Sequence, residues 1–134
     1  MSKYDFGYEL EYGSTNEWAF HEVQRNSDVL ELGSSVGNLT SHLVQEKGCL
    51  VDIVEIDEEA GDKAQQFAEL ALIGEKGDLN GRVWMDELLK RNRRYDYIVI
   101  LDVLEHLLHP ENTLESAKML LKSTGKILLS IPNV

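Results

Sequence analysis

The most informative part of the sequence is Val29-Leu-Glu-Leu-Gly-Ser-Ser-Val-Gly-Asn-Leu-Thr40, where a short apolar run leads into a loop with two glycines and then a helical pattern. The run predicts a strand over residues 29–32. Gly33 and Gly37 allow the backbone to turn sharply and approach a ligand closely, because glycine tolerates positive φ and has no Cβ. The following helix would begin with unpaired N–H groups and a positive dipole end, which suit an anionic group. The stretch therefore predicts a strand–loop–helix unit that binds a small anionic ligand.

Two common phosphate-binding patterns are excluded by the spacing of this loop. The dinucleotide pattern Gly-x-Gly-x-x-Gly fails because Ser35 and Asn38 occupy its second and third glycine positions. The Walker pattern fails because no Gly-Lys-Ser/Thr follows Gly37. The pattern that fits is acidic-x-Gly-x-x-x-Gly, with Glu31, Gly33 and Gly37 in the defined places. A ligand-free turn between a strand and a helix is the alternative interpretation.

Strands and helices alternate along the rest of the chain. Apolar runs predict strands over residues 29–32, 50–56, 70–73, 95–101 and 126–131. A capping box at Ser14–Glu17 predicts a helix to about residue 23, and further helices are expected over 38–46, 57–70, 85–90 and from Pro110 up to Gly125. This alternation predicts an α/β fold of right-handed βαβ units, with helices on both faces of an open parallel sheet. Residues 1–134 would form a single domain with an irregular N-terminal arm over residues 1–13.

The composition limits the partners and the compartment. The 134 residues carry a formal net charge of −11, which argues against nucleic acid, because binding to phosphate backbones depends on clusters of Lys and Arg. The one basic run, Lys90–Arg94, is interpreted as a solvated loop. No apolar run is long enough for a membrane span, and the N-terminus lacks a signal peptide, so no membrane partner is expected. The single Cys49 predicts a buried thiol in a reducing, cytoplasmic compartment.

Four acidic residues lie at or just after the carboxyl ends of predicted strands, where open parallel sheets bind ligands: Glu31, Glu55, Asp78 and Asp102. Glu55 stands 22 residues after Gly33, and its carboxylate could accept both hydrogen bonds of a ribose diol. NAD or another nucleoside cofactor would use such a group. The alternative is a surface acid within the acid-rich turn at residues 55–59.

Three motifs together resemble those of the class I S-adenosylmethionine (SAM)-dependent methyltransferases. The first is the pattern at residues 31–37, with Ser34 and Ser35 where the family commonly has Cys or Ala and Gly. The second, Asp102-Val-Leu-Glu-His-Leu107, is similar to the motif after strand four in a branch that includes small-molecule O-methyltransferases of quinone biosynthesis and domains associated with glycosyltransferases. The third is the segment Leu121-Lys-Ser-Thr-Gly-Lys-Ile-Leu-Leu-Ser-Ile-Pro-Asn133, which resembles the entry into strand five of that branch.

This resemblance runs from Asp28 to the C-terminus and implies a Rossmann-like open parallel sheet with strand order 3-2-1-4-5. Because the chain stops at Val134, the two C-terminal antiparallel strands of such enzymes would be absent, and we expect a truncated form of a longer protein. Strand five would then be an exposed sheet edge that favours self-association.

The resemblance also implies a binding site for SAM and its product S-adenosylhomocysteine (SAH). The glycine loop would pass the methionine part over its backbone, and Glu31 would orient the ammonium group. Glu55 would hold the ribose hydroxyls, and Asp78 the adenine edge, with Gly74–Glu75 as a competing alignment that the sequence leaves open. The cofactor-binding residues implied in this way are Glu31, Gly33, Ser35, Gly37, Glu55, Ile56, Asp78, Asp102 and Val103.

Asp102 and Val103 would line the pocket by the sulfonium. Methyl transfer is an in-line displacement on an activated carbon, so the protein mainly supplies proximity, orientation and exclusion of water. A base is needed only where the acceptor must lose a proton, and His106 is the candidate catalytic residue, with a loop histidine as the alternative. Asp102, Glu105 and His106, with His109 nearby, have a spacing that could hold a divalent ion, but too few further ligands follow, so no metal is expected.

The sequence thus predicts a SAM-dependent methyltransferase core that acts on a small molecule, with a sugar, a glycan precursor or a quinone-like hydroxyl as candidate acceptors. A non-catalytic SAM- or nucleotide-binding module of a larger protein is the first alternative. An NAD-dependent oxidoreductase is the second, with Glu55 in its favour and the missing glycine pattern against it.

Overall fold

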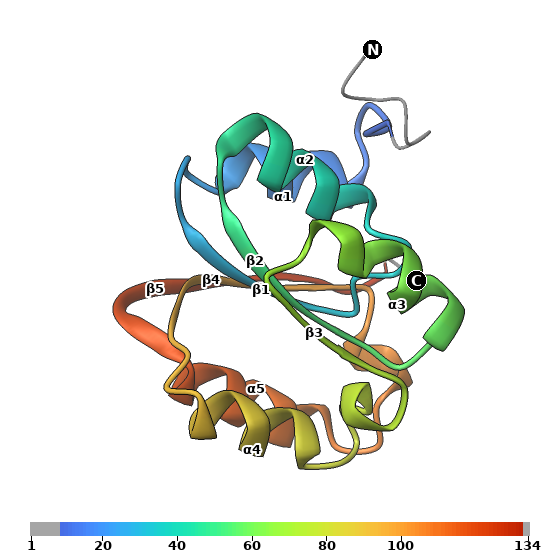
Figure 1. Ribbon diagram of the computed structural model, residues 1–134, viewed down its shortest axis with the longest axis vertical. Coiled ribbons are helices and arrows are strands. Elements are labelled where there is room, and N and C mark those ends of the chain that lie inside the picture. The colour runs from blue at the N-terminus through green and yellow to red at the C-terminus, as the bar shows by residue number, and fades with distance from the viewer. Residues whose placement is uncertain (1–8, 133–134) are drawn as a thin grey trace.

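The computed structural model describes residues 9–132 and has a five-stranded parallel sheet as its middle layer (Figure 1). The strands are β1 (Asp28–Leu32), β2 (Leu50–Glu55), β3 (Leu70–Ile73), β4 (Tyr95–Leu101) and β5 (Leu121–Ser130). The helices are α1 (Thr15–Glu22), α2 (Asn38–Lys47), α3 (Glu58–Ala64), α4 (Val83–Lys90) and α5 (Pro110–Met119). Short 3₁₀ segments cover Gln65–Phe67, Gly74–Gly77 and Leu104–His106. The strand order is β3-β2-β1-β4-β5 with every pair parallel, which confirms the predicted Rossmann-like α/β fold.

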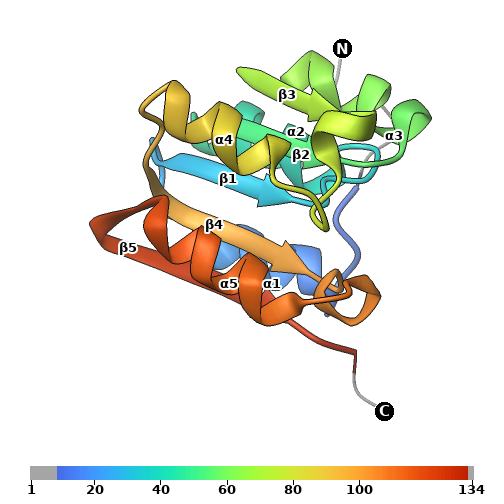
Figure 2. The ribbon, with the colours of Figure 1, turned by 90° about the horizontal axis from the view of Figure 1, so that it is seen from below.

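Helices cover both faces of the sheet, as predicted: α4 and α5 lie on one face, and α1, α2 and α3 on the other (Figures 1 and 2). Because side chains alternate along a strand, β1 sends Leu30 toward α4 and α5, and Val29 toward α1 and α2. At the carboxyl end of β1, Leu32 lies between Val54 of β2 and Ile100 of β4, so the three central strands end side by side. Burial of both faces explains the nearly continuous apolar character of these strands.

The first helix begins as its sequence predicts. The Ser14 hydroxyl accepts a hydrogen bond from the backbone N–H of Glu17 (3.1 Å), and the Glu17 carboxylate accepts one from the N–H of Gly13 (3.0 Å). The capping box is therefore present, with the second bond made one residue earlier than in its usual form. Residues 9–13 of the predicted irregular arm contain no helix or strand, and residues 1–8 lie outside the described part of the chain.

Two of the predicted helices are too long. The helix expected over residues 57–70 ends at Ala64 and continues as a 3₁₀ turn, because the N–H of Glu69 already bonds to the carbonyl of Val51 (2.8 Å) at the start of β3. The helix expected to reach Gly125 ends at Met119, because the chain from Leu121 onward pairs with β4 as a strand.

The start of strand five was consequently predicted too late. Leu121 pairs with Tyr95 at the beginning of β4, whereas the expected strand began at residue 126. A register shift between Tyr95 and Tyr97 separates the two parts of β5. Gly125 lies in this irregular part, where an added Cβ would be 2.7 Å from the carbonyl oxygen of Tyr95, so the close approach of the strands depends on glycine.

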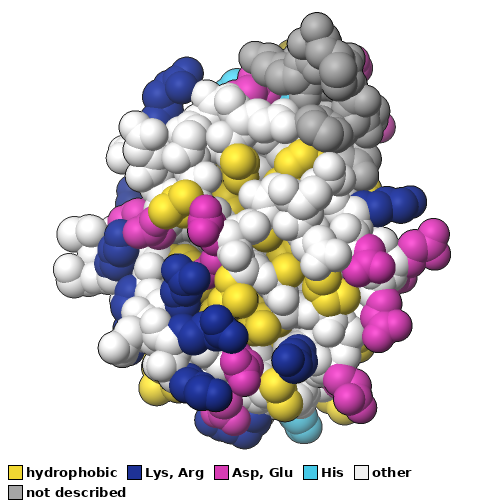
Figure 3. Space-filling model, viewed as in Figure 1, with side chains coloured by type: hydrophobic (Ala, Val, Ile, Leu, Met, Phe, Trp, Pro, Cys, Tyr) yellow, Lys and Arg dark blue, Asp and Glu magenta, His cyan; other side chains and the backbone are white. Residues whose placement is uncertain are grey.

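Charge is distributed unevenly over the surface. On the face drawn in Figure 3, Lys and Arg side chains gather on the left, where the loop between α4 and β4 and the start of β5 lie, and Asp and Glu side chains gather on the right, near α3. The basic run at residues 90–94 is the end of α4 and the exposed loop after it, as predicted. Within residues 9–132, no helix combines the length and apolar character that crossing a bilayer requires.

Candidate functional site

Two adjoining hollows lie at the carboxyl ends of the central strands, where the order of the sheet reverses between β1 and β4. The strand-end cleft has a volume of about 410 Å³ and extends from the end of β2 to the residues after β3 and β4. The loop hollow has a volume of about 210 Å³ and lies between the glycine loop and the start of α1. Four residues line both hollows, namely Gly33, Ser35, Leu101 and Asp102.

The glycine loop adopts a conformation that depends on its glycines. Gly33 has φ 86°, and an added Cβ would lie 2.5 Å from a methyl group of Val103. Gly37 has φ 94°, and an added Cβ would lie 2.9 Å from the Cα atom of Ala64. Ser35 between them also has a positive φ of 53°, which is unfavourable for a residue with a side chain. Such strain is typical of ligand-binding loops.

Glu55 fixes this loop from the end of β2. One of its carboxylate oxygens accepts a hydrogen bond from the N–H of Ser35 (2.7 Å), and the other accepts one from the N–H of Asp57 (2.9 Å). Each oxygen keeps a second lone pair, and Glu55 lines the strand-end cleft together with the exposed Ile56. Glu55 is therefore a buried structural group of the loop as well as a candidate ligand group, and the interpretation as a plain surface acid is wrong.

Glu31 lies in the loop hollow, under the first turns of α2. Its carboxyl group is buried and accepts a hydrogen bond from the hydroxyl of Thr40 (2.6 Å). Burial raises the pKa of Glu31 to about 7, the Thr40 hydrogen bond opposes this rise, and the nearby Glu55 carboxylate adds to it. The group therefore gains or loses its proton near neutral pH, and a cation in the hollow would favour its ionised form.

Asp102 and Val103 follow β4, where both hollows meet. Asp102 has a positive φ of 56°, and its carboxylate accepts a hydrogen bond from the hydroxyl of Ser130 on β5 (3.1 Å). Its N–H bonds to the backbone carbonyl of Ser130 (3.2 Å). The strained backbone of Asp102 is thus held by the neighbouring strand, and Val103 closes over Gly33.

The turn after β3 brings Asp78 to the far side of the strand-end cleft. Gly77 packs against the backbone so closely that an added Cβ would lie 2.4 Å from the carbonyl oxygen of Glu55. Asp78 lines the cleft and accepts a hydrogen bond from the N–H of Asn80 (2.9 Å). Glu75, the competing residue, is exposed and is not among the residues that line the cleft.

His106 lines the outer part of the strand-end cleft with a side chain that is 76% exposed. Its Nε2 atom lies 3.8 Å from the carboxylate of Glu105. Within residues 9–132, no three His, Cys, Asp or Glu side chains come together in a metal-binding arrangement, so the alternative of an ion between Asp102, Glu105 and His106 is not supported.

Several residues of the two hollows were not predicted from the sequence. Thr15, Asn16 and Asn38 line the loop hollow, and Leu79 and Asn80 line the strand-end cleft. Asn38 directly follows Gly37, which is the one local signal that could have identified it. The others are brought to the site by the packing of α1 and by a loop contact, in which the Asn80 amide oxygen accepts a hydrogen bond from the N–H of Leu108 (2.9 Å).

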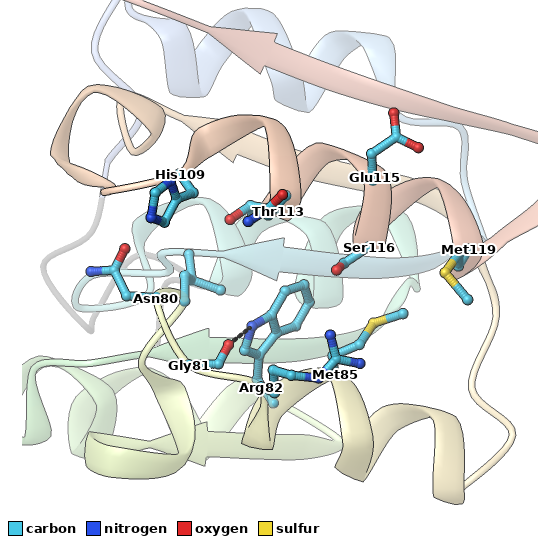
Figure 4. A pocket seen from close by; sticks show the side chains of 12 residues that line it. Asn80, Gly81, Arg82, Met85, His109, Thr113, Glu115, Ser116 and Met119 are labelled. Carbon is cyan, nitrogen blue, oxygen red and sulfur yellow. Dashed lines mark hydrogen bonds between the residues drawn. The ribbon is translucent and has the colours of Figure 1, made fainter.

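A third hollow, of about 440 Å³, lies on the helix face between α4 and α5 (Figure 4). His109, just before α5, and Ser116 of α5 lie across it from Arg82 and Met85. The indole N–H of Trp84, which also lines this hollow, donates to the carbonyl of Gly81 (3.1 Å). None of the predicted cofactor-binding residues lines it. The strand-end cleft and the loop hollow are therefore the candidate site.

An open α/β sheet with a strained glycine loop at its switch point, facing acidic side chains from the next strands, is an arrangement typical of nucleotide- and nucleoside-binding proteins. Residues 14–134 match the family described as "Methyltransferase domain", and the chain belongs to this family. It is 29% identical over 115 residues to the ubiquinone biosynthesis O-methyltransferase of Nitrosospira multiformis, an alignment that covers 84% of this chain and 46% of that relative. The chain spans about half the length of the curated relatives it matches.

Solved methyltransferases have the same fold. An S-adenosylmethionine-dependent methyltransferase from Clostridium acetobutylicum superposes with a TM-score of 0.68 at 17% identity, over 96% of this chain and 54% of that one. Coclaurine N-methyltransferase bound to N-methylheliamine and SAH gives a TM-score of 0.66 at 18% identity, over 91% of this chain and 39% of that one. The family match thus confirms the predicted methyltransferase membership, and these structures confirm the predicted fold.

Proposed function

We propose that this domain binds SAM across the two hollows and transfers its methyl group to a small-molecule acceptor. The observation that carries the proposal is the meeting of both hollows at Gly33, Ser35 and Asp102, which makes one long site with acidic groups at both ends. A ligand with a cationic amino-acid end and a nucleoside end fits such a site. The NAD alternative is weaker, because the glycine pattern lacks the dinucleotide spacing.

The proposed contacts follow the positions of the side chains. Glu31 would face the ammonium group in the loop hollow, and Glu55, with Ile56 beside it, would accept from the ribose hydroxyls. Asp78 would take the adenine amino group, a role favoured over Glu75 by its place in the cleft. Gly33, Ser35 and Val103 would hold the cofactor by backbone contact and shape. Gly37 lines neither hollow and would act by setting the course of the loop against Ala64.

The cofactor supplies an activated methyl group, so the chain's own contribution is placement of the reacting groups and exclusion of water. Asp102 lies where both hollows meet and would line the reacting end of the cofactor. His106, at the outer edge of the cleft, would take the proton of an acceptor hydroxyl. Its exposure leaves room for the acceptor to approach between it and the cofactor.

The acceptor is proposed to be a small hydroxyl compound, with a quinone-like phenol favoured by the ubiquinone O-methyltransferase relatives and a sugar or glycan precursor as the other candidate. The net charge of −11 and the acidic side chains near α3 argue against nucleic acid. The free, buried Cys49 supports a cytoplasmic location. Within the described residues β5 is an edge strand, and its outer edge is the proposed surface for self-association.

Calorimetric titration with SAH tests the proposed function, with NAD as the competing ligand. We expect micromolar binding of SAH and none of NAD. Glu55→Gln keeps the shape of the side chain but removes the charge, and should weaken SAH roughly ten- to a hundredfold. Glu59→Gln, an exposed acid four residues on, is the control and should bind normally. Preference for NAD, or no binding of either, would refute the proposal, and SAH binding with no transfer to any acceptor would favour the non-catalytic alternative.

A further inference from the structure

Asn38 is the residue of the loop hollow that the roles above leave unused. It is the first residue of α2 and follows the left-handed Gly37. Its side-chain Oδ1 atom is shielded from solvent, and no group within residues 9–132 donates a hydrogen bond to it. No other buried side-chain nitrogen or oxygen in that part of the chain lacks a partner. Because buried polar atoms are nearly always hydrogen-bonded, this oxygen indicates a ligand that donates.

The chemistry of the surrounding hollow limits what that ligand is. Glu31 and Asp102 provide carboxylate oxygens, and further oxygens come from Thr15, Asn16, Ser34 and Ser35. No Lys, Arg or His among the described residues lines the hollow. A primary ammonium group carries three N–H donors and no acceptor, so it can satisfy several of these oxygens at once. A carboxylate or phosphate would instead lie beside the carboxylates of Glu31 and Asp102 with no cationic side chain to offset them.

Starting from the proposed function, we infer that the Oδ1 atom of Asn38 accepts a hydrogen bond from the α-ammonium group at the methionine end of the cofactor. Glu31 lines the same hollow and contributes the opposite charge. Asn38 contributes direction, since a neutral carbonyl oxygen bonds along its lone pairs. The oxygen is already removed from water in the free protein, so the pairing requires no further desolvation of the oxygen itself, and the carboxylates of the hollow offset the desolvation of the ammonium group.

The test is the substitution Asn38→Leu, which removes the amide but nearly preserves the volume of the side chain. Calorimetry compares SAH, its decarboxylated analogue, which keeps the amine, and 5′-methylthioadenosine, which lacks the whole amino-acid end. We expect the variant to lose roughly ten- to a hundredfold in affinity for the first two ligands and to bind 5′-methylthioadenosine like the wild type. Asn112→Leu, an exposed asparagine on α5, is the matched control and should change none of the three affinities.

Thermal unfolding without ligand provides the second readout. Removal of a buried oxygen that has no partner should leave the melting temperature of Asn38→Leu equal to or above that of the wild type. Equal loss of all three ligands together with a lower melting temperature would make Asn38 a structural residue and overturn the inference. Loss of SAH alone would assign the contact to the carboxylate instead, and an unchanged SAH affinity would exclude any contact.

Failure of the proposed function would be visible separately, as a wild type that binds none of the three nucleosides. The inference would then be judged on L-methionine, through the NMR signals of the Asn38 side-chain amide during titration of the wild type. The control ligand is the analogue of methionine that lacks the amino group. A shift of the Asn38 amide signals with L-methionine but not with this analogue would support an ammonium site. Identical shifts with both compounds, or none, would overturn it.

Discussion

Substitution of Glu31 by Gln should stabilise the protein at and above neutral pH, although it alters the candidate binding site. Burial raises the pKa of Glu31 from 4.5 to about 7, so over this range the native state holds a proton that the unfolded state has lost. Stability contributed by the neutral carboxyl is therefore fully present below pH 4.5 and is lost as the pH rises to about 7. At about 1.4 kcal/mol per pH unit, the ionised group costs about 3 kcal/mol above that point.

The glutamine variant avoids this cost at every pH and keeps an oxygen that can accept from Thr40. Its additional N–H donors lower the gain, so we expect about 2 kcal/mol at pH 8 and little difference at pH 4.5. Urea unfolding of both proteins across this range measures the difference, with the exposed Glu59→Gln as control. A gain that does not depend on pH, or a less stable variant at pH 8, would refute the assignment of a buried, strained carboxylate to Glu31.

The same group should make cofactor binding depend on pH. An ammonium group in the loop hollow favours the ionised form of Glu31, so wild-type affinity for SAH should rise as the pH passes through about 7. In Glu31→Gln the affinity should be lower and nearly flat with pH. Calorimetry in two buffers of different ionisation enthalpy would also detect the proton released on binding to the wild type.

Three further substitutions test other parts of the structure. Gly37→Ala should cost about 2–4 kcal/mol and abolish SAH binding, measured by urea unfolding and calorimetry, because the Cβ would meet Ala64 at a positive φ. Tyr95→Phe should cost about 1–3 kcal/mol in urea unfolding, because it removes the hydroxyl that donates to the buried carboxylate of Asp52 at 2.6 Å. Lys47→Met should lower the melting temperature and weaken SAH, because the Lys47 ammonium group bonds the last carbonyls of α1, whose first turn lines the loop hollow.

Each of these changes has a control in the chain. Gly81→Ala places its Cβ 3.5 Å from the nearest atom and should be nearly neutral. Tyr97→Phe alters a buried tyrosine on the same strand without touching the Asp52 pair. Lys63→Met removes an exposed lysine from α3. Equal losses in a variant and its control would contradict the contact assigned to that residue.

The sequence could predict the glycine loop, Glu31 and Glu55 because their signals are local. The spacing of these residues defines a turn, and their place after apolar runs puts them at strand ends. The end of α5 was not predictable in this way, because Leu121 leaves its apolar helical pattern to pair with Tyr95 of β4, which is distant in sequence. The two apolar residues directly after Met119, Leu120 and Leu121, fit a helix and a strand equally well.

The unpredicted part of the site has the same cause. Thr15 and Asn16 were recognised as the start of a helix, but nothing in their sequence says that α1 packs beside the glycine loop. Asn80 joins the cleft because a hydrogen bond to Leu108 brings together two loops that are separated by a strand and a helix. Tertiary contacts thus bring Thr15, Asn16 and Asn80 to the site, whereas local motifs place the glycine loop, Glu31 and Glu55.

The position of β1 in the sheet has a consequence for the order of folding. Only α2 separates β1 from its neighbour β2 in the sequence. Its other neighbour, β4, follows much later in the chain, after β3 and α4. Because the first three strands are joined by shorter connections, we expect them to associate before the last two. Gly33 and Glu55 belong to the early half, and Asp102 and Val103 to the late half. In a refolding experiment followed by stopped flow, circular dichroism should thus recover before SAH binding, so that ligand capture reports the moment at which the two halves join.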